Sequence, residues 1–496
     1  MAHASLDRLR RDLEQFGYEL AKEEYANLVG LKADVDTSRI YRRYGNLHTM
    51  DTLGRVRACT PRDEDEARRL RYLEFDLLGT VIGNRFKEAD DWLSTEETKA
   101  VCEVDGKKIP YRDIDTLIAE EANRPKRRRL RDAMVTVSRR FLPYNERLLL
   151  AGRAAMRDLG YPDEAECWTR QHGIDLEGMD RLMQRVLSVT AKSYSAAMDE
   201  RLEEVVGVGL PQAEGHDVSF LMRARKFDRY FPKDKTVPAL FGTLKGMGFR
   251  LDRMGNVTLD LEDRSNKDSR AFVMPAKVPH DVRLVTRPRG GVDDYRSLFH
   301  ESGHALHFAL TEESLPYEYR YHGDSGVTES YAFLFEHLLE NPRFLAEVAP
   351  KLKGAALSDY LRFTALEKLL SLRYYAAALH YDRFLATHDL EDAQEKYPAW
   401  MTDALKYPAN PLSYLSTDGF YGMWYLRAWL FEAMHRRYLE ERFGETWWRD
   451  PGAGEHLKRF YRQGEKPKVE DLAAECGFKK LDIKPLMQDL QRLAEA

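Results

Sequence analysis

The segment around residue 300 holds two histidines and a glutamate at a spacing that suits metal chemistry. His300, Glu301 and His304 form the pattern HExxH, and Asp293 or Asp294 can cap the start of their helix after a Gly-Gly loop. Residues four apart in a helix share a face, so both imidazoles can reach one zinc ion. Glu301 is rotated by about 100° from His300, where its carboxylate can take a proton from water beside the metal. The pattern therefore predicts a zinc site in which Glu301 is the general base.

A catalytic zinc needs a third protein ligand and one open position. We expect Glu329, which follows His304 by 25 residues and lies in a second predicted helix that begins near Thr328. A proline and glycines between the two helices allow the chain to turn back, so the helices can run antiparallel. Glu336 and Glu340, on the same second helix, are the alternatives to Glu329.

Helical periodicity dominates the elements that must position these residues. Apolar residues recur at steps of three and four, and we expect long helices over about 179–206, 356–385 and 421–442. Within 248–292 apolar and polar residues alternate instead, as in VTLDL at 257–261. This predicts a small, largely antiparallel sheet in an otherwise helical protein.

The periodic pattern breaks over about 206–220, where glycines and a proline gather. We therefore expect two parts, an N-terminal helical lobe over residues 1–208 and a catalytic region over residues 209–496.

The composition is typical of a folded protein with a solvated surface. The 496 residues are 43% hydrophobic and 32% charged, and 77 basic against 82 acidic residues leave a net charge of −5. This balance argues against nucleic acid or an anionic membrane as a partner, and the basic cluster at 124–131 is interpreted as a solvated helix start. The sequence contains no apolar run of about 18 residues and no apolar leader, so we expect a cytoplasmic protein.

The cysteines give no metal-binding pattern. Cys59, Cys102, Cys167 and Cys476 lie far apart and form no CxxC pair. We therefore expect neither a disulfide scaffold nor a cysteine-based metal site.

The stretches DDYRSLFHESGHALHF at 293–308 and VTESYAFLFEHLLENP at 327–342 resemble the thimet oligopeptidase and oligoendopeptidase F family of zinc metallopeptidases. The likeness extends from about residue 250 to the C-terminus. It implies that His300 and His304 bind zinc, that Glu301 is the catalytic glutamate and that Glu329 is the third ligand. It also implies a mostly α, α+β fold with two helical lobes, a small sheet beside the HExxH helix and a deep central cleft.

The same resemblance implies tyrosines that donate to the oxyanion of the reaction. The matching stretch here contains Tyr421 and Tyr425, which are four residues apart and can share a helix face. Their spacing differs from the usual one in the family, and a histidine usually found upstream is absent. Aromatic packing is the alternative role for both.

The expected activity is zinc-dependent hydrolysis of peptide bonds in short, unfolded peptides, with one zinc ion per chain. A zinc carboxypeptidase or dipeptidyl carboxypeptidase of the same HExxH-plus-glutamate type is one alternative. A catalytically silent, zinc-containing peptide-binding protein is another, although the intact Glu301 argues against it. The cleavage-site preference and the oligomeric state stay open.

Other polar residues near the pattern have less specific interpretations. We expect His307 to pack in the core, since a fourth protein ligand would close the site. His322 is expected either in contact with substrate or in a solvated loop. Arg287 and Arg289 are expected at the surface rather than on a substrate carboxylate.

Overall fold

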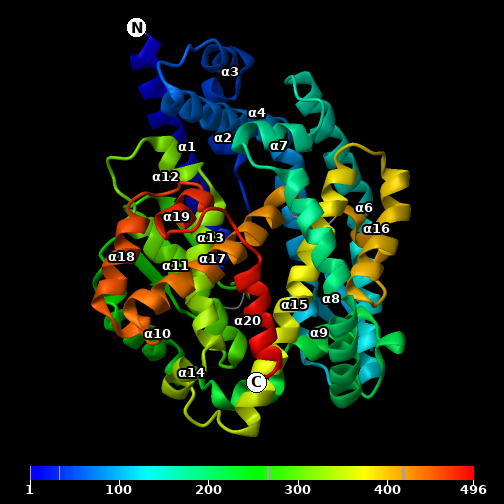
Figure 1. Ribbon diagram of the computed structural model, residues 1–496. Coiled ribbons are helices and arrows are strands. Elements are labelled where there is room, and N and C mark those ends of the chain that lie inside the picture. The colour runs from blue at the N-terminus through cyan, green and yellow to red at the C-terminus, as the bar shows by residue number, and fades with distance from the viewer. Residues whose placement is uncertain (1, 33, 265–266, 269, 416–418) are drawn as a thin grey trace. The chain divides into compact units, whose positions relative to one another are not determined.

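The computed structural model describes residues 2–32, 34–264, 267–268, 270–415 and 419–496, and the protein is mostly helical (Figure 1). The chain forms two compact units, each assembled from separate stretches of sequence. Unit 1 comprises residues 1–91, 227–357 and 427–489, and unit 2 comprises residues 92–226, 358–426 and 490–496. Each unit therefore takes residues from both sides of position 208, where the sequence pattern breaks. Three long helices carry the chain from one unit into the other: α4 (Glu64–Lys99), α15 (Ala355–Leu385) and α17 (Gly422–Phe443).

Unit 1 contains the HExxH helix, which is α11 (Val292–Leu310). Helix α11 packs against a small sheet and against α10, α13 and α18, and α1 also contacts this sheet. Unit 1 also contains parts of α4, α15, α17 and α20 (Lys484–Ala494). Its other helices are α1 (Ala2–Leu28), α2 (Ser38–Arg43), α3 (Met50–Arg57), α10 (Thr236–Gly246), α12 (Tyr317–Tyr321), α13 (Ser325–Glu336), α14 (Pro342–Val348), α18 (Pro451–Tyr461) and α19 (Val469–Glu475).

The sheet of unit 1 lies where the alternating pattern predicted it, but it is mixed rather than largely antiparallel. Its strands are β3 (Val257–Asp260), β4 (Phe272–Lys277) and β5 (Asp281–Val285), in the order β3-β5-β4. Strand β5 pairs antiparallel with β4 and parallel with β3. Alternation indicates that a segment forms a strand with one buried face, whereas strand direction depends on which neighbours it meets in space.

Unit 2 is built on long helices and one short hairpin. The helices that lie wholly within it are α5 (Ile114–Glu120), α6 (Arg124–Asp158), α7 (Glu164–His172), α8 (Leu176–Val206), α9 (Gly215–Met222) and α16 (Leu390–Leu405). The expected long helices are confirmed as α8, α15 and α17. The hairpin of β1 (Val101–Val104) and β2 (Lys107–Pro110) was not expected, and it packs against α6 with Cys102 fully buried.

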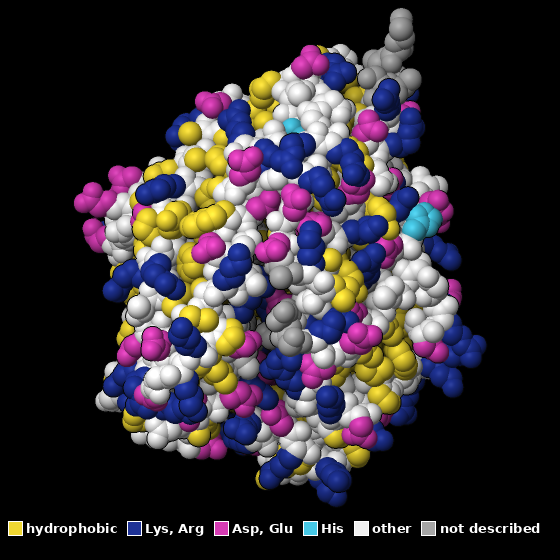
Figure 2. All heavy atoms as spheres, turned by 180° about the vertical axis from the view of Figure 1, so that it is seen from behind, with side chains coloured by type: hydrophobic (Ala, Val, Ile, Leu, Met, Phe, Trp, Pro, Cys, Tyr) yellow, Lys and Arg dark blue, Asp and Glu magenta, His cyan; other side chains and the backbone are white. Residues whose placement is uncertain are grey.

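The basic cluster at 124–131 does start a helix, α6, and several of its charges are paired. The guanidinium groups of Arg124 and Arg127 bind the buried carboxylate of Asp217, at 2.8 and 2.7 Å. Arg129 pairs with Asp105 at the surface. On the face shown in Figure 2, basic and acidic side chains are interspersed.

Within the described ranges, no helix is both long enough and apolar enough to cross a membrane.

Candidate metal centre

The close contact of α11 and α13 brings the predicted ligands together. Gly303 lies at this contact, and a Cβ atom there would be 2.5 Å from the backbone oxygen of Tyr331 and 2.6 Å from the Cα of Ala332. No side chain fits in this space, so the glycine inside the HExxH pattern sets how closely the helices approach. Buried apolar residues on α11, including Leu298 and Phe299, also anchor the helix.

The start of α11 is held by an aspartate from a distant stretch of the chain. The backbone N–H of Val292 donates to the Asp228 carboxylate, 3.2 Å away. The preceding residue, Gly291, has φ of 103°, a conformation that favours glycine. The structure thus differs from the expected capping by Asp293 or Asp294, because the Asp294 carboxylate accepts the backbone N–H of Gly290 in the loop before the helix.

His300, His304 and Glu329 converge on one point. The Nε2 atom of His300 lies 3.6 Å from Oε2 of Glu329, and Nε2 of His304 lies 3.5 Å from the same oxygen. One donor atom from each residue lies within 4.8 Å of the other two. Two donors that share a tetrahedral zinc at about 2.1 Å are about 3.4 Å apart, so these separations suit a metal ion. The side chains are 17%, 12% and 3% exposed, respectively, so the point of convergence lies below the surface.

Both imidazole rings are oriented through their other nitrogen. Nδ1 of His300 lies 2.8 Å from Oε2 of Glu336, and Nδ1 of His304 lies 2.8 Å from the hydroxyl oxygen of Thr328. A proton on each Nδ1 leaves the Nε2 lone pair directed at Glu329, which is the arrangement that metal-binding histidines use. Glu336 therefore orients the imidazole of His300 through Nδ1. Glu340, the other alternative to Glu329 as third ligand, lies 3.7 Å from His337. Sequence reasoning did not assign Thr328, although it directly precedes Glu329.

The charges in the site also suit a cation. Burial raises the pKa of Glu329, but His304 and His300 oppose it and hold this pKa well below its usual range. Burial lowers the pKa of His300, but Glu329 and Glu336 outweigh it and raise this pKa well above its usual range. Without metal, the negatively charged Glu329 carboxylate is therefore buried beside a protonated His300 imidazole. A cation bound among these groups replaces that proton.

Comparison with known proteins relates the chain to a known fold. No model of a known protein family matches the chain, and no curated protein matches it significantly. A solved structure, the crystal structure of BsuCP, aligns over 100% of this chain and 99% of its own, with 14% sequence identity and a TM-score of 0.63. At this identity the likeness shows a shared fold over the whole chain, and a shared fold does not by itself define an activity.

Glu301, the predicted base, directly follows the predicted ligand His300 on α11 and is half-buried. It forms no hydrogen bond or ion pair with the residues that the structure describes. Its carboxylate is thus not engaged in the support of the site, in contrast to Glu336.

Tyr421 and Tyr425 lie beside each other in unit 2, with ring centroids 5.3 Å apart. Tyr421 is exposed and ends a short 3-10 turn, and Tyr425 lies in the first turns of α17, where its ring also contacts Tyr375. The predicted metal ligands belong to unit 1, and the role of the two tyrosines as oxyanion donors stays a prediction.

His307 and His322, the two further histidines near the HExxH pattern, both contact neighbouring side chains. His307 is fully buried with its ring 5.1 Å from that of Tyr331, and burial lowers its pKa to about 3, in keeping with the expected core position. His322 is not a solvated loop residue, because its Nε2 lies 3.0 Å from the Tyr317 hydroxyl and 3.4 Å from the Asp76 carboxylate. Burial lowers the pKa of His322, but Asp76 outweighs this and raises it.

The two arginines that precede α11 do not point to a substrate-binding role. Arg287 forms an ion pair with Asp263, so its charge is already matched. Arg289 donates its backbone N–H to the Asp294 carboxylate.

Proposed function

We propose that this protein is a zinc-dependent peptidase that cleaves short, unfolded peptides and is related to the thimet oligopeptidase and oligoendopeptidase F family. The observation that carries the proposal is the convergence of two imidazole Nε2 atoms from α11 on one carboxylate oxygen from α13. Glu301 follows the first of these histidines. These four positions are the ones that the sequence resemblance assigns to the zinc ligands and the base.

His300, His304 and Glu329 would hold the zinc ion, one per chain at this centre. Zinc bound there polarises a peptide carbonyl and makes water more acidic. The Glu301 carboxylate accepts the proton of the attacking water and later delivers it to the nitrogen of the leaving amine. Glu336 and Thr328 hold the imidazoles in the tautomer that keeps Nε2 available.

Two features of the proposal rest on the sequence resemblance. The restriction to short, unfolded peptides follows from the deep cleft that the resemblance implies, which would exclude folded proteins. Tyr421 and Tyr425 are proposed to donate hydrogen bonds to the oxyanion, as the matching family stretch implies.

A peptide digest tests the activity and its direction together. Zinc-loaded protein is incubated with a peptide library whose members carry either a free or a blocked C-terminus, and the fragments are identified by mass spectrometry. We expect internal cuts in both sets, and we expect a chelator to abolish them. Cuts restricted to free C-termini would make the protein a carboxypeptidase, and intact peptides with zinc bound would make it a binding protein.

A further inference from the structure

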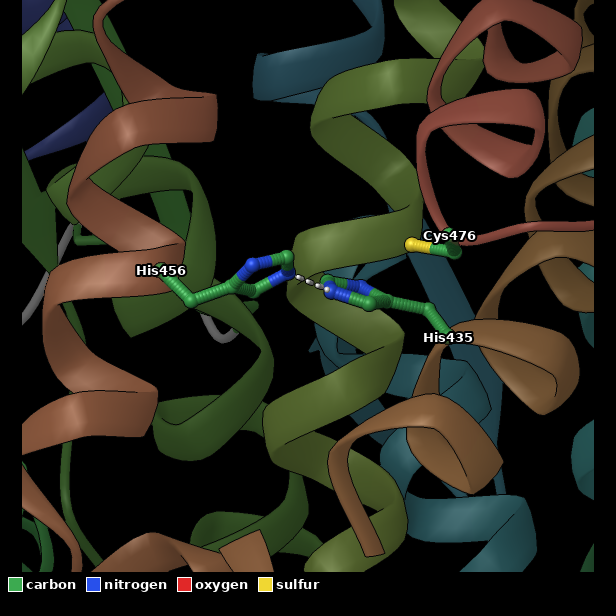
Figure 3. Close-up of side chains that lie close together, drawn as sticks. All are labelled: His435, His456 and Cys476. Atoms are coloured by element: carbon green, nitrogen blue, oxygen red, sulfur yellow. Dashed lines mark hydrogen bonds between the residues drawn. The ribbon is translucent and has the colours of Figure 1, made fainter. Parts of the chain in front are cut away.

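A second group of metal-ligating side chains lies in unit 1, away from the residues of the first centre in sequence. His435 comes from α17, His456 from α18, and Cys476 directly follows α19. One ligand atom of each lies within 4.8 Å of the other two. Figure 3 shows the two imidazoles facing each other and the Cys476 sulfur directed toward the His435 ring.

All three side chains are buried, and their polar atoms have few other partners. His435 is fully buried, and His456 and Cys476 are each 8% exposed. The two Nε2 atoms lie 3.0 Å apart, so without metal one imidazole donates a hydrogen bond to the other. Nδ1 of His435 is buried and has no hydrogen-bond partner within the described ranges. The nitrogen of each ring that faces the other ring is Nε2, so Nε2 is the atom that each imidazole offers to a shared ion.

The charged groups around the cluster are paired with one another. Arg459, on the same helix as His456, is balanced by Glu475, 2.5 Å away. The buried carboxylate of Glu432, on the same helix as His435, pairs with Arg436 at 2.8 Å, so its negative charge is matched as well.

We propose that His435, His456 and Cys476 form a second metal site, which binds a thiophilic ion of the zinc type. Two imidazole nitrogens on one tetrahedral zinc lie about 3.3 Å apart, and a nitrogen and a sulfur about 3.6 Å apart. The two rings therefore need to separate by about 0.3 Å from their present hydrogen bond. The thiol proton leaves to solvent as the thiolate binds. The imidazole whose Nε2–H donates in the hydrogen bond moves that proton to its own Nδ1, so both Nε2 lone pairs can form metal–nitrogen bonds in place of the hydrogen bond.

This site differs from the cysteine patterns that short sequence spacings reveal. Its ligands come from three separate elements, so no CxxC pair is needed, and the proposal departs from the expectation that the cysteines bind no metal. An ion held there would tie α17 to α18 and to the end of α19. The existence of this site does not depend on the proposed peptidase activity.

Cobalt distinguishes the two centres, because only the second contains sulfur. The full-length protein is stripped of metal under reducing conditions and titrated with Co²⁺ or Zn²⁺, and bound metal is counted by elemental analysis. We expect two ions per chain, together with thiolate-to-cobalt absorption in the near ultraviolet. Cys476→Ser should reduce the count to one and abolish this absorption, while His304→Ala should reduce the count to one and retain it.

Matched variants guard against simple misfolding. Cys167→Ser alters another buried cysteine, on α7 in unit 2, and should change neither the count nor the absorption. If Cys476→Ser does not fold, His456→Gln replaces it, and loss of one ion with an unchanged circular dichroism spectrum supports the site. One ion per chain in the parent protein, or thiolate absorption that survives Cys476→Ser, would overturn the proposal and leave only a hydrogen-bonded pair of imidazoles.

Discussion

At the metal centre, the group that holds each Nδ1 decides what the opposite nitrogen of the ring can bind. Glu336 holds His300 with a carboxylate, and Thr328 holds His304 with a hydroxyl group. A carboxylate partner also makes the imidazole a stronger ligand. The two histidines are therefore supported unequally, although they are equivalent in the sequence pattern.

Glu301→Gln separates metal binding from proton transfer. The amide cannot accept the proton of the attacking water, so we expect peptide turnover to fall by at least about a hundredfold, the usual contribution of a general base. Zinc content should not change, because Glu301 is not a ligand. Turnover is measured with a peptide substrate and zinc by elemental analysis, with exposed Glu312→Gln as the control. An active Glu301→Gln protein would remove this residue from the proposed mechanism.

Glu336→Gln tests the support of His300. The amide oxygen can still accept a hydrogen bond from Nδ1, but it lacks the charge, so we expect zinc affinity to fall by about 10- to 100-fold. Glu329→Gln should weaken binding further, because it removes a ligand. Competition with a chromophoric chelator measures both affinities, and Glu441→Gln on the exposed face of α17 serves as the control. Equal affinity in the Glu336→Gln and parent proteins would show that other contacts hold the ring.

At the scale of elements, α11 and α13 can approach closely because Gly303 has no side chain. The Cβ of Gly303→Ala would lie 2.5 Å from the Tyr331 backbone oxygen, so the helices must move apart. We expect a loss of about 1–3 kcal/mol in the free energy of unfolding and weaker zinc binding. Denaturant unfolding and metal titration measure the two effects.

A second helical glycine provides the control for Gly303→Ala. A Cβ at Gly242, on α10, meets no atom within 4 Å. Gly242→Ala should therefore raise helix stability by up to about 1 kcal/mol and leave zinc binding unchanged. If both alanine variants behave alike, the close approach of α11 and α13 does not control the site.

The ion pairs between α6 and α9 make the stability of unit 2 depend on pH. Burial raises the pKa of Asp217, but hydrogen bonds from His216, Arg124 and Arg127 outweigh it and lower this pKa below its usual range. An unfolded aspartate titrates near pH 3.9, so the stabilisation is complete above about pH 5 and is lost as the pH falls through the lower folded value. Asp217→Asn leaves the buried Arg127 without its anion and should cost about 3–5 kcal/mol at pH 7.

The difference between Asp217→Asn and the parent protein should shrink as the pH falls below about 4. Urea unfolding at several pH values measures this difference. Asp105→Asn removes an ion pair with Arg129 that is half exposed, and it should cost at most about 1 kcal/mol at any pH. A constant penalty for Asp217→Asn down to pH 3 would mean that its charge is not what stabilises the contact.

At the scale of the whole molecule, the features that sequence could predict are local ones. The HExxH spacing is contained in two turns of helix, and the long helices and the strand segments follow from periodicity over 10 to 30 residues. Glu329 was predicted partly from its place on a second helix and partly from a resemblance, because nothing in a 25-residue gap determines where that helix packs.

The features that sequence could not predict depend on contacts between distant stretches. Asp228 reaches the start of α11 across 64 positions, and β3 pairs parallel with β5 although β4 lies between them in the chain. His435 and His456 are 21 residues apart on different helices. Local periodicity does not predict such long-range contacts, because they depend on how complete elements pack together.

The interleaving of the two units has a practical consequence for anyone who dissects this protein. Neither unit corresponds to a continuous gene fragment, because each contains three separate stretches of the chain. Truncation from either end therefore removes material from a compact unit that the remaining sequence needs, and limited proteolysis within α4, α15 or α17 would damage both halves together. Loss of function after such cuts locates no active residue, and single-residue substitution is the informative way to map this molecule.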